Sequence, residues 1–373
     1  MKILNHSPSI SKEELKVIKE CLDEGWVSSA GPYVERFQKD LEKTVSNEKA
    51  NGYAACVVNG TCAIHAALEL LKIGPGDEVI LPSLTFIASR NAIFHAGAIP
   101  AYIDSDRDTW QMDPKEVEKA ITPRTKAILP VHLFGNACDL DPILEIAKAH
   151  KLHVIEDAAE ALGSTYQGVH CGLHGNLGIL SFNGNKIVTT GGGGAIITQN
   201  ENLRNRALEL TNQGRLLDSG EYDETIVGYN YRLTSLQAAF GIAQLTRFQE
   251  FMESKKRIFN QYQERLSKHS EIKFQEILPN STTNHWLVSF TFEGKSGTAL
   301  REKTLKHLIS QGIQARRIFQ PNHQLNAPKA IHLASKAFHS ATDIYERGLS
   351  LPSSSSLTEK DVDWICNEIE KYL

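Results

Sequence analysis

Short apolar runs alternate with helical patterns over the first half of the chain. Between the runs, apolar residues recur at intervals of three or four, as on one face of a helix. Continuous apolar runs separated by helices indicate βαβ units and a parallel sheet that is buried on both faces. The predicted strands are 55–58, 79–81, 100–103, 127–131 and 153–155, and the predicted helices are 64–71, 88–94, 114–121 and 142–149.

The pattern changes after residue 164. Short glycine-rich strands are expected over 164–198, and one long amphipathic helix is expected over 236–266. A strand over 286–292 and helices over 298–311 and 359–372 follow. The chain is therefore predicted to be an α/β protein. Its large domain, 1–245, carries the mostly parallel sheet, and a smaller C-terminal α+β domain spans 246–373.

Composition narrows the classes of function. The 373 residues include 40 basic and 44 acidic side chains, a net charge of −4, which argues against a large nucleic-acid-binding surface. No apolar run approaches the roughly 18 residues of a membrane span, and the first residues lack the apolar core of a signal peptide. The six cysteines are scattered without the spacing of metal ligands. We therefore expect a cytoplasmic protein without a metal site and without nucleic-acid or membrane partners.

A predicted strand ends at Glu156 and Asp157. This puts a carboxylate at the C-terminal edge of the sheet, where open α/β sheets bind ligands. A carboxylate in that position is costly unless a cation pairs with it, and a protonated heterocyclic nitrogen would be such a cation. The alternative is a helix cap or a surface carboxylate.

A lysine follows the predicted strand 177–182. Lys186 lies in a turn of small residues and is followed by the glycine run 191–194. Lysine forms Schiff bases with aldehydes, most readily when its site lowers the pKa of the amine. Taken alone, Lys186 is also compatible with a solvated surface position.

Two further segments follow predicted strands. Gly60 and Thr61 begin a helix after a strand, and backbone N–H groups at a helix start form an anion site suited to phosphate. An ordinary helix cap is equally compatible with this segment. Phe86, which follows the strand 79–81, could lie flat on a heteroaromatic ring or pack in the core.

Taken together, these segments resemble the DegT/DnrJ/StrS family of nucleotide-sugar aminotransferases. The resemblance covers nearly the whole chain and is carried by the combination of Glu156-Asp-Ala-Ala159, Ser181-Phe-Asn-Gly-Asn-Lys186 and Asn230-Tyr-Arg232. It implies a pyridoxal 5′-phosphate (PLP) enzyme of fold type I, the aspartate aminotransferase fold. L-Glutamate is the implied amino donor, with pyridoxamine 5′-phosphate as the other cofactor form, and the acceptor is a nucleotide-linked keto-sugar.

The resemblance also implies a role for individual residues. Lys186 matches the lysine that forms the Schiff base with PLP, and Asp157 matches the carboxylate that pairs with the pyridine nitrogen. Gly60, Thr61 and Ser181 match phosphate-binding positions, and Phe86 matches the position that stacks on the ring. Asn230 matches an asparagine that reaches the cofactor of the neighbouring subunit, which implies a homodimer with shared active sites.

Glu160 departs from the family pattern, because many members carry glutamine at this position, which contacts the phenolic oxygen of PLP. Together with 182–187 and 191–194, it is similar to a narrower subgroup that acts at C4 of UDP-linked 4-keto-6-deoxy-N-acetylhexosamines. In the C-terminal half, Trp286, Arg316, Arg317 and His323 are candidates for substrate contacts, each equally compatible with packing or a solvated surface.

Two alternatives stay open. A sugar dehydratase on the same scaffold carries histidine where this chain has Lys186, which argues against that activity. A catalytically idle homologue that acts as a binding or regulatory subunit would not need an intact set of Lys186, Asp157 and Thr61.

Overall fold

A central eight-stranded sheet organises the protein, whose computed structural model describes residues 3–327 and 329–373. The strand order is β1-β9-β8-β5-β4-β2-β3-β14. Strand β9 runs antiparallel to both of its neighbours, and the other neighbouring pairs are parallel. The bounds are β1 Tyr53–Val57, β2 Glu78–Pro82, β3 Ile99–Ile103, β4 Thr125–Ile128, β5 His153–Asp157, β8 Leu177–Ser181, β9 Gly194–Thr198 and β14 His332–Leu333. The predicted α/β class with a mostly parallel sheet is confirmed.

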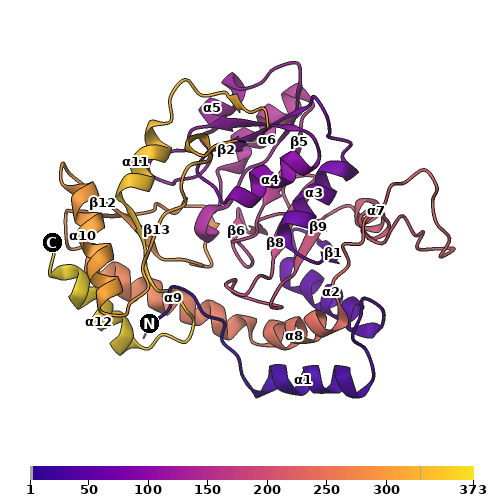
Figure 1. Cartoon of the computed structure of the whole chain (residues 1–373), viewed down its shortest axis with the longest axis horizontal. Coiled ribbons are helices and arrows are strands. Elements are labelled where there is room, and N and C mark those ends of the chain that lie inside the picture. The colour runs from indigo at the N-terminus through magenta and orange to yellow at the C-terminus, as the bar shows by residue number, and fades with distance from the viewer. Residues whose placement is uncertain (1–2, 328) are drawn as a thin grey trace.

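Helices cover both faces of this sheet (Figure 1). Alternate residues of a strand face opposite sides, so Ile80 packs in one hydrophobic core while Val79 and Leu81 pack in the other. The helices are α1 Lys12–Asp23, α2 Pro32–Val45, α3 Gly60–Leu70, α4 Ile87–His95, α5 Pro114–Lys119, α6 Leu140–His150, α7 Glu201–Thr211, α8 Ser235–Thr246, α9 Phe248–Leu266, α10 Gly297–Ser310, α11 His339–Arg347 and α12 Glu359–Glu370. Helices α2, α7 and α11 were not expected from the apolar pattern.

The single long helix predicted over 236–266 is wrong, because the chain forms two helices, α8 and α9, that meet at Arg247. Arg247 leaves the helical conformation, with φ −103° and ψ 7°. Its guanidinium bonds to Glu14 of α1 and to Glu250 of α9. Helix α8 packs against α1 and α2, whereas α9 continues toward the C-terminal part of the protein (Figure 1). Apolar spacing cannot register a one-residue break, because the apolar residues on either side keep their intervals.

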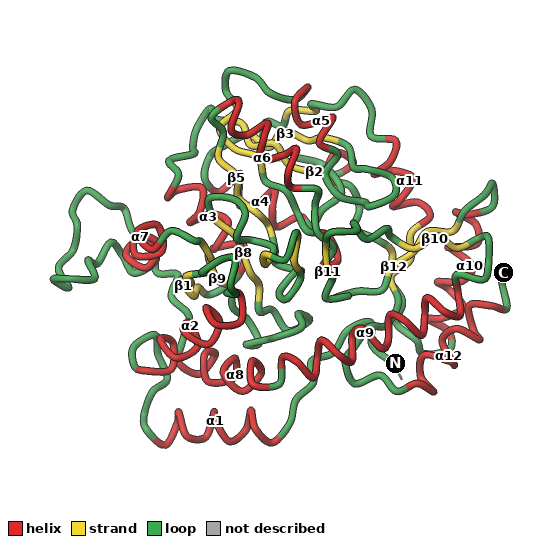
Figure 2. The backbone as a smooth tube through the Cα atoms, turned by 180° about the vertical axis from the view of Figure 1, so that it is seen from behind, coloured by secondary structure: helices red, strands yellow, loops and turns green. Residues whose placement is uncertain are grey.

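A second, antiparallel sheet of order β10-β12-β15-β13 forms the C-terminal part, at the end of the molecule farthest from α7 (Figure 2). Its strands are β10 Ile272–Phe274, β12 Ser289–Phe292, β13 Arg316–Arg317 and β15 Gly348–Ser350. A small third sheet joins β6 Thr165–Tyr166, β7 Val169–His170 and β11 Ser281–Thr282. Two short 3-10 turns lie at Leu133–Gly135 and Asn322–Gln324.

The domain division at residue 245 stays a prediction, and two segments cross it. Ile3 packs in the C-terminal core and pairs with Ile313. In the other direction, β14 returns from the C-terminal half to the edge of the large sheet beside β3. Within the described residues, no helix combines the length and apolar character that a membrane span requires.

Candidate active site

A cavity of about 360 Å³ opens at the C-terminal edge of the central sheet. Ten residues singled out from the sequence line it, namely Gly60, Thr61, Phe86, Asp157, Glu160, Ser181, Lys186, Trp286, Arg316 and Arg317. Most of them follow strands of the sheet directly, and the last three come from the C-terminal half. Parallel strands bring their C-terminal ends to one edge, which explains why segments so distant in sequence meet there.

Asp157 is the last residue of β5 and is 5% exposed. Its carboxylate accepts hydrogen bonds from the Ser89 hydroxyl, at 2.7 Å, and from the Ala159 amide, at 3.2 Å. Within the described residues, no lysine, arginine or histidine forms an ion pair with it. Asp157 is therefore a buried carboxylate that lines the cavity and lacks a cationic partner from the protein.

Lys186 reaches the same cavity from the turn after β8. Its Nζ lies 3.7 Å from Glu160 Oε1 and 3.9 Å from the centroid of the Trp286 ring, and its side chain is 13% exposed. Burial lowers the pKa of the Lys186 amine, while Glu160 and Asp157 oppose that shift. A lowered pKa leaves a larger fraction of the amine unprotonated, as a nucleophile or base requires.

Glu160 is 6% exposed and accepts a hydrogen bond from the Phe134 amide through Oε2, at 2.8 Å. Its other carboxylate oxygen faces Lys186. Burial raises the pKa of Glu160 to about 7, and the Lys186 charge and the Phe134 amide only partly offset this effect. Near neutral pH this carboxyl group can therefore either hold or release a proton.

The N-terminus of α3 forms another part of the cavity wall. Asn59 caps the helix by accepting a hydrogen bond from the Cys62 amide, so the cap belongs to Asn59, and Gly60 and Thr61 begin the first turn. The first amides of a helix have no acceptor within it. Gly194 in β9 lets the start of α3 lie close to the sheet, because a Cβ at position 194 would lie 2.5 Å from the Asn59 backbone. Ser181 ends β8 beside Gly60.

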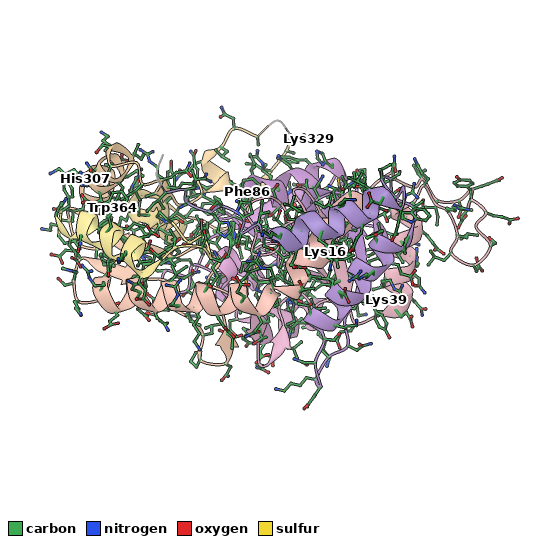
Figure 3. The ribbon with its side chains drawn as sticks, turned by 90° about the horizontal axis from the view of Figure 1, so that it is seen from below. Lys16, Lys39, Phe86, His307, Lys329 and Trp364 are labelled. Atoms are coloured by element: carbon green, nitrogen blue, oxygen red, sulfur yellow. The ribbon has the colours of Figure 1, made fainter. Side chains whose placement is uncertain are left out.

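Phe86 is 53% exposed, so it is not a core residue. It caps the start of α4, and its ring centroid lies 5.5 Å from that of Phe319. Seen from below, it lies where the N-terminal and C-terminal parts of the chain meet (Figure 3). This exposed aromatic face beside the cavity is available to a flat ligand.

The predicted substrate residues differ in their surroundings. Trp286 is 2% exposed and its indole N–H is bonded to the Asn185 carbonyl, whereas Arg316 and Arg317 form the exposed strand β13. Arg317 pairs with Glu302 at 2.5 Å. His323 does not line the cavity, since its ring stacks on Phe338 and bonds to Ser83.

Asn230 also lies outside the cavity lining and is exposed on the surface of the protein. It follows a loop after α7 that projects away from the rest of the fold (Figure 1).

Sequence reasoning missed three residues near the site. Ser89, one helical turn after Phe86, supports Asp157, and its spacing on α4 was the available signal. Asn5 and Phe319 also line the cavity. Asn5 comes from the N-terminal segment and Phe319 from the C-terminal half, and no local pattern marked either of them.

The residues present fit PLP. Asp157, buried without a cation of its own, suits a protonated ring nitrogen. The amine of Lys186 suits an aldehyde, and the free amides at the start of α3 suit a phosphate. Asp157, Lys186 and the start of α3 all line the same cavity.

Known proteins are similar to this chain over nearly its whole length. The DegT/DnrJ/EryC1/StrS aminotransferase family matches residues 8–370. The chain is 40% identical over 369 residues to GDP-perosamine synthase of Caulobacter vibrioides, which covers 98% of this chain and 97% of that protein. It is 38% identical over 370 residues to GDP-perosamine synthase of Escherichia coli O157:H7, with 98% and 97% covered.

Among solved structures, the PLP form of Spr1654 from Streptococcus pneumoniae superposes with a TM-score of 0.89 at 27% identity. It covers 99% of this chain and 98% of that one.

Proposed function

Because the chain belongs to the DegT/DnrJ/EryC1/StrS aminotransferase family and is a PLP-dependent sugar aminotransferase, we propose that it transfers the amino group of L-glutamate to C4 of a nucleotide-linked 4-keto-6-deoxy sugar. One observation carries the assignment of the site. The amine of Lys186 lies in the cavity, 3.7 Å from Glu160. Burial lowers the pKa of this amine, and the charge of Asp157 opposes that shift.

Lys186 is proposed as the base in both halves of the reaction. PLP, when bound, supplies an aldehyde that takes up the amino group and a ring that accepts electrons. The Lys186 amine removes a proton from the α-carbon of the amino donor and later delivers a proton to the sugar carbon. Because one amine serves both substrates in turn, the kinetics are expected to be ping-pong.

The other residues are proposed to hold the cofactor. Asp157 keeps the pyridine nitrogen protonated, since a buried carboxylate without a cationic partner favours a positive charge beside it. The amides of Gly60 and Thr61, with the Ser181 hydroxyl, bind the phosphate. Phe86 covers one face of the ring.

Two observations bear on the nucleotide. The relatives at 40% and 38% identity are named GDP-perosamine synthases, which favours a GDP-linked sugar. Glu160 and the strings 182–187 and 191–194 favour instead a UDP-linked N-acetylated sugar. Arg316, exposed in the cavity wall, suits the diphosphate that both nucleotides share.

The active site is proposed to be shared between two subunits. Asn230 lies outside the cavity of its own subunit, and Leu217, Tyr222 and Val227 are exposed on the loop that leads to it. A second copy that covers this loop would bring Asn230 to the partner's cavity. In mixed dimers of Asn230→Ala and Lys186→Ala, one of the two sites should recover activity, and no recovery would contradict a shared site.

Borohydride reduction followed by peptide mapping tests the central assignment. Reduction of the PLP-loaded protein should leave the cofactor on Lys186, and Lys186→Ala should carry no adduct. Addition of L-glutamate should abolish the absorption band of PLP bound to the wild type. An adduct at another lysine, or none, would overturn the proposal.

A panel of GDP-, UDP- and dTDP-linked 4-keto-6-deoxy sugars, each assayed with L-glutamate, identifies the acceptor. We expect the GDP-linked sugar to be turned over fastest. Faster turnover of a UDP-linked N-acetylated sugar would instead support the assignment drawn from Glu160 and the two strings.

A further inference from the structure

Lys255 of α9 is a buried lysine that does not line the cavity. It is 1% exposed, and its ammonium donates hydrogen bonds to two backbone carbonyls, that of Trp286 at 2.8 Å and that of Ser353. Within the described part of the chain, no carboxylate forms an ion pair with it. The amine of Lys255 therefore bonds to two uncharged carbonyls, whereas the amine of most lysines is exposed to water.

Stability alone is a weak reason to keep such a residue, because taking an ammonium out of water without a counter-charge is costly. Burial accordingly lowers the pKa of Lys255 well below its ordinary value. The position of its two acceptors therefore matters more than its contribution to packing.

The segment that Lys255 holds adopts a costly conformation. His285, immediately before Trp286, has a φ of +49°, in the left-handed region that non-glycine residues avoid. Its ring stacks on Phe259 of α9 at 4.0 Å. A backbone in this region is maintained only where its surroundings determine it strongly. The bond from Lys255 to the Trp286 carbonyl ties this turn to α9.

Trp286 connects this turn to Lys186. Its indole N–H donates to the Asn185 carbonyl at 2.7 Å, one residue before Lys186. The face of its ring lies 3.9 Å from Lys186 Nζ. Trp286 therefore covers the amine on one side and fixes the backbone beside it on the other.

We propose that Lys255 is a positioning residue for Lys186, which it serves by holding the Trp286 indole against the amine. This inference rests on the proposed role of Lys186 and extends it to a residue outside the cavity. Without the Lys255 ammonium, the turn at 285–286 loses an anchor, the indole moves, and water reaches the amine.

The pKa of Lys186 indicates whether the Trp286 indole still shields the amine from water. Burial is the largest influence on the pKa of Lys186, and Glu160 and Asp157 are the charged groups that face it. Burial, and to a smaller extent the Lys186 charge, lower the pKa of His6 on the N-terminal segment. Replacing Lys255 leaves Glu160 and Asp157 in place, whereas His6 loses one of the charges that lower its pKa. Loss of cover should move the pKa of Lys186 upward, toward that of a hydrated lysine.

Lys255→Met tests the proposal, with Lys256→Met as the matched control on the exposed side of the same helix. The cofactor-free proteins are methylated with formaldehyde and borohydride over a range of pH, and labelling of Lys186 is followed by peptide mapping. In Lys255→Met, the labelling midpoint of Lys186 should rise by about one pH unit, and turnover of the PLP-loaded enzyme should fall roughly tenfold. Lys256→Met should match the wild type in both measurements.

A double-mutant cycle separates positioning from general destabilisation. Trp286→Leu should raise the labelling midpoint of Lys186 on its own, and adding Lys255→Met should raise it little further, because both changes remove the same cover. Fully additive shifts, or an unchanged midpoint in folded Lys255→Met, would overturn the proposal. Should Lys255→Met fail to fold, an unchanged midpoint in Trp286→Leu would overturn it as well.

Failure of the proposal about Lys255 can be distinguished from failure of the proposed function. If Lys186 is not the residue that binds PLP, borohydride maps the cofactor to another position, whatever the labelling midpoints show.

Discussion

The two carboxylates at the end of β5 face opposite regions of the molecule. Glu156 points into the interior, where its side chain is fully buried and accepts hydrogen bonds from three amides within 172–175 and from His132. Asp157 points into the cavity and accepts two hydrogen bonds. Successive residues of a strand face opposite sides, so adjacent residues of one type enter different environments.

Glu160, three residues further on, extends the contrast. His132 and the surrounding amides overcome the cost of burial and lower the pKa of Glu156 to about 2. Glu160 accepts a single amide, and burial raises its pKa to about 7. The number of hydrogen bonds that a buried carboxylate receives thus separates a structural group from one that can exchange protons.

The largest expected effect is on stability, from Glu156→Gln. An amide in place of the carboxylate leaves the His132 charge uncompensated and turns an N–H group toward the amide donors. The free energy of unfolding should fall by about 3–5 kcal/mol, as for other broken buried pairs. Denaturant unfolding of the cofactor-free protein measures this loss, and stability equal to the wild type would show that the network of Glu156 contributes nothing.

The stability from Glu156 should also depend on pH in one direction. Since folding lowers its pKa from 4.5 to about 2, the contribution is complete above pH 4.5 and is lost as the pH falls toward 2. Acid unfolding of Glu156→Gln should lack this component. If the stability of the wild type falls no more steeply than that of the variant between pH 4.5 and pH 2, the assignment is contradicted.

Asp157→Asn should have the opposite signature. We expect the protein to fold and to bind PLP, with kcat reduced by ~100-fold or more, because the charge that stabilises the protonated ring is lost. Steady-state kinetics and cofactor titration measure the two properties separately, and Glu156→Gln that is still folded should keep the turnover of the wild type. Near-normal turnover in Asp157→Asn would identify the wrong carboxylate.

Glu160→Gln should change how stability depends on pH. Folding raises the pKa of Glu160 from 4.5 to about 7, so the wild type loses stability as the pH rises through this window. Thermal unfolding of the cofactor-free proteins at pH 5 and pH 8 should show a smaller difference for Glu160→Gln than for the wild type. Equal differences would mean that Glu160 is ionised throughout.

The smallest effect is expected from Ser89→Ala. It removes one of the two hydrogen bonds to Asp157 and leaves the charge in place, a loss of about 1 kcal/mol. Turnover should fall roughly fivefold, with cofactor binding nearly unchanged. A loss as large as that of Asp157→Asn would mean that orientation of the carboxylate, and not its charge, is what matters.

Local patterns along the chain account for part of this fold. Alternating apolar runs and helical spacing predicted most strands of the sheet and most of its helices, but not β14 or the antiparallel direction of β9. Gly60, Asp157 and Lys186 lie at or shortly after strand ends, so the edge of a parallel sheet brings them together. The break at Arg247 lay beyond this reasoning. Helix α2 was missed although its buried residues Tyr33, Phe37, Leu41 and Val45 recur at intervals of four.

The rest of the site depends on contacts between segments that are distant in sequence. Asn5 reaches the cavity from the N-terminal segment and Phe319 from the C-terminal half. Lys255 bonds to the carbonyls of Trp286 and Ser353 across 31 and 98 residues. The protonation of Glu156 and Glu160 likewise depends on partners brought by folding. Periodicity records which face of an element is apolar, whereas contacts between elements depend on how they pack, and that information is spread over the whole chain.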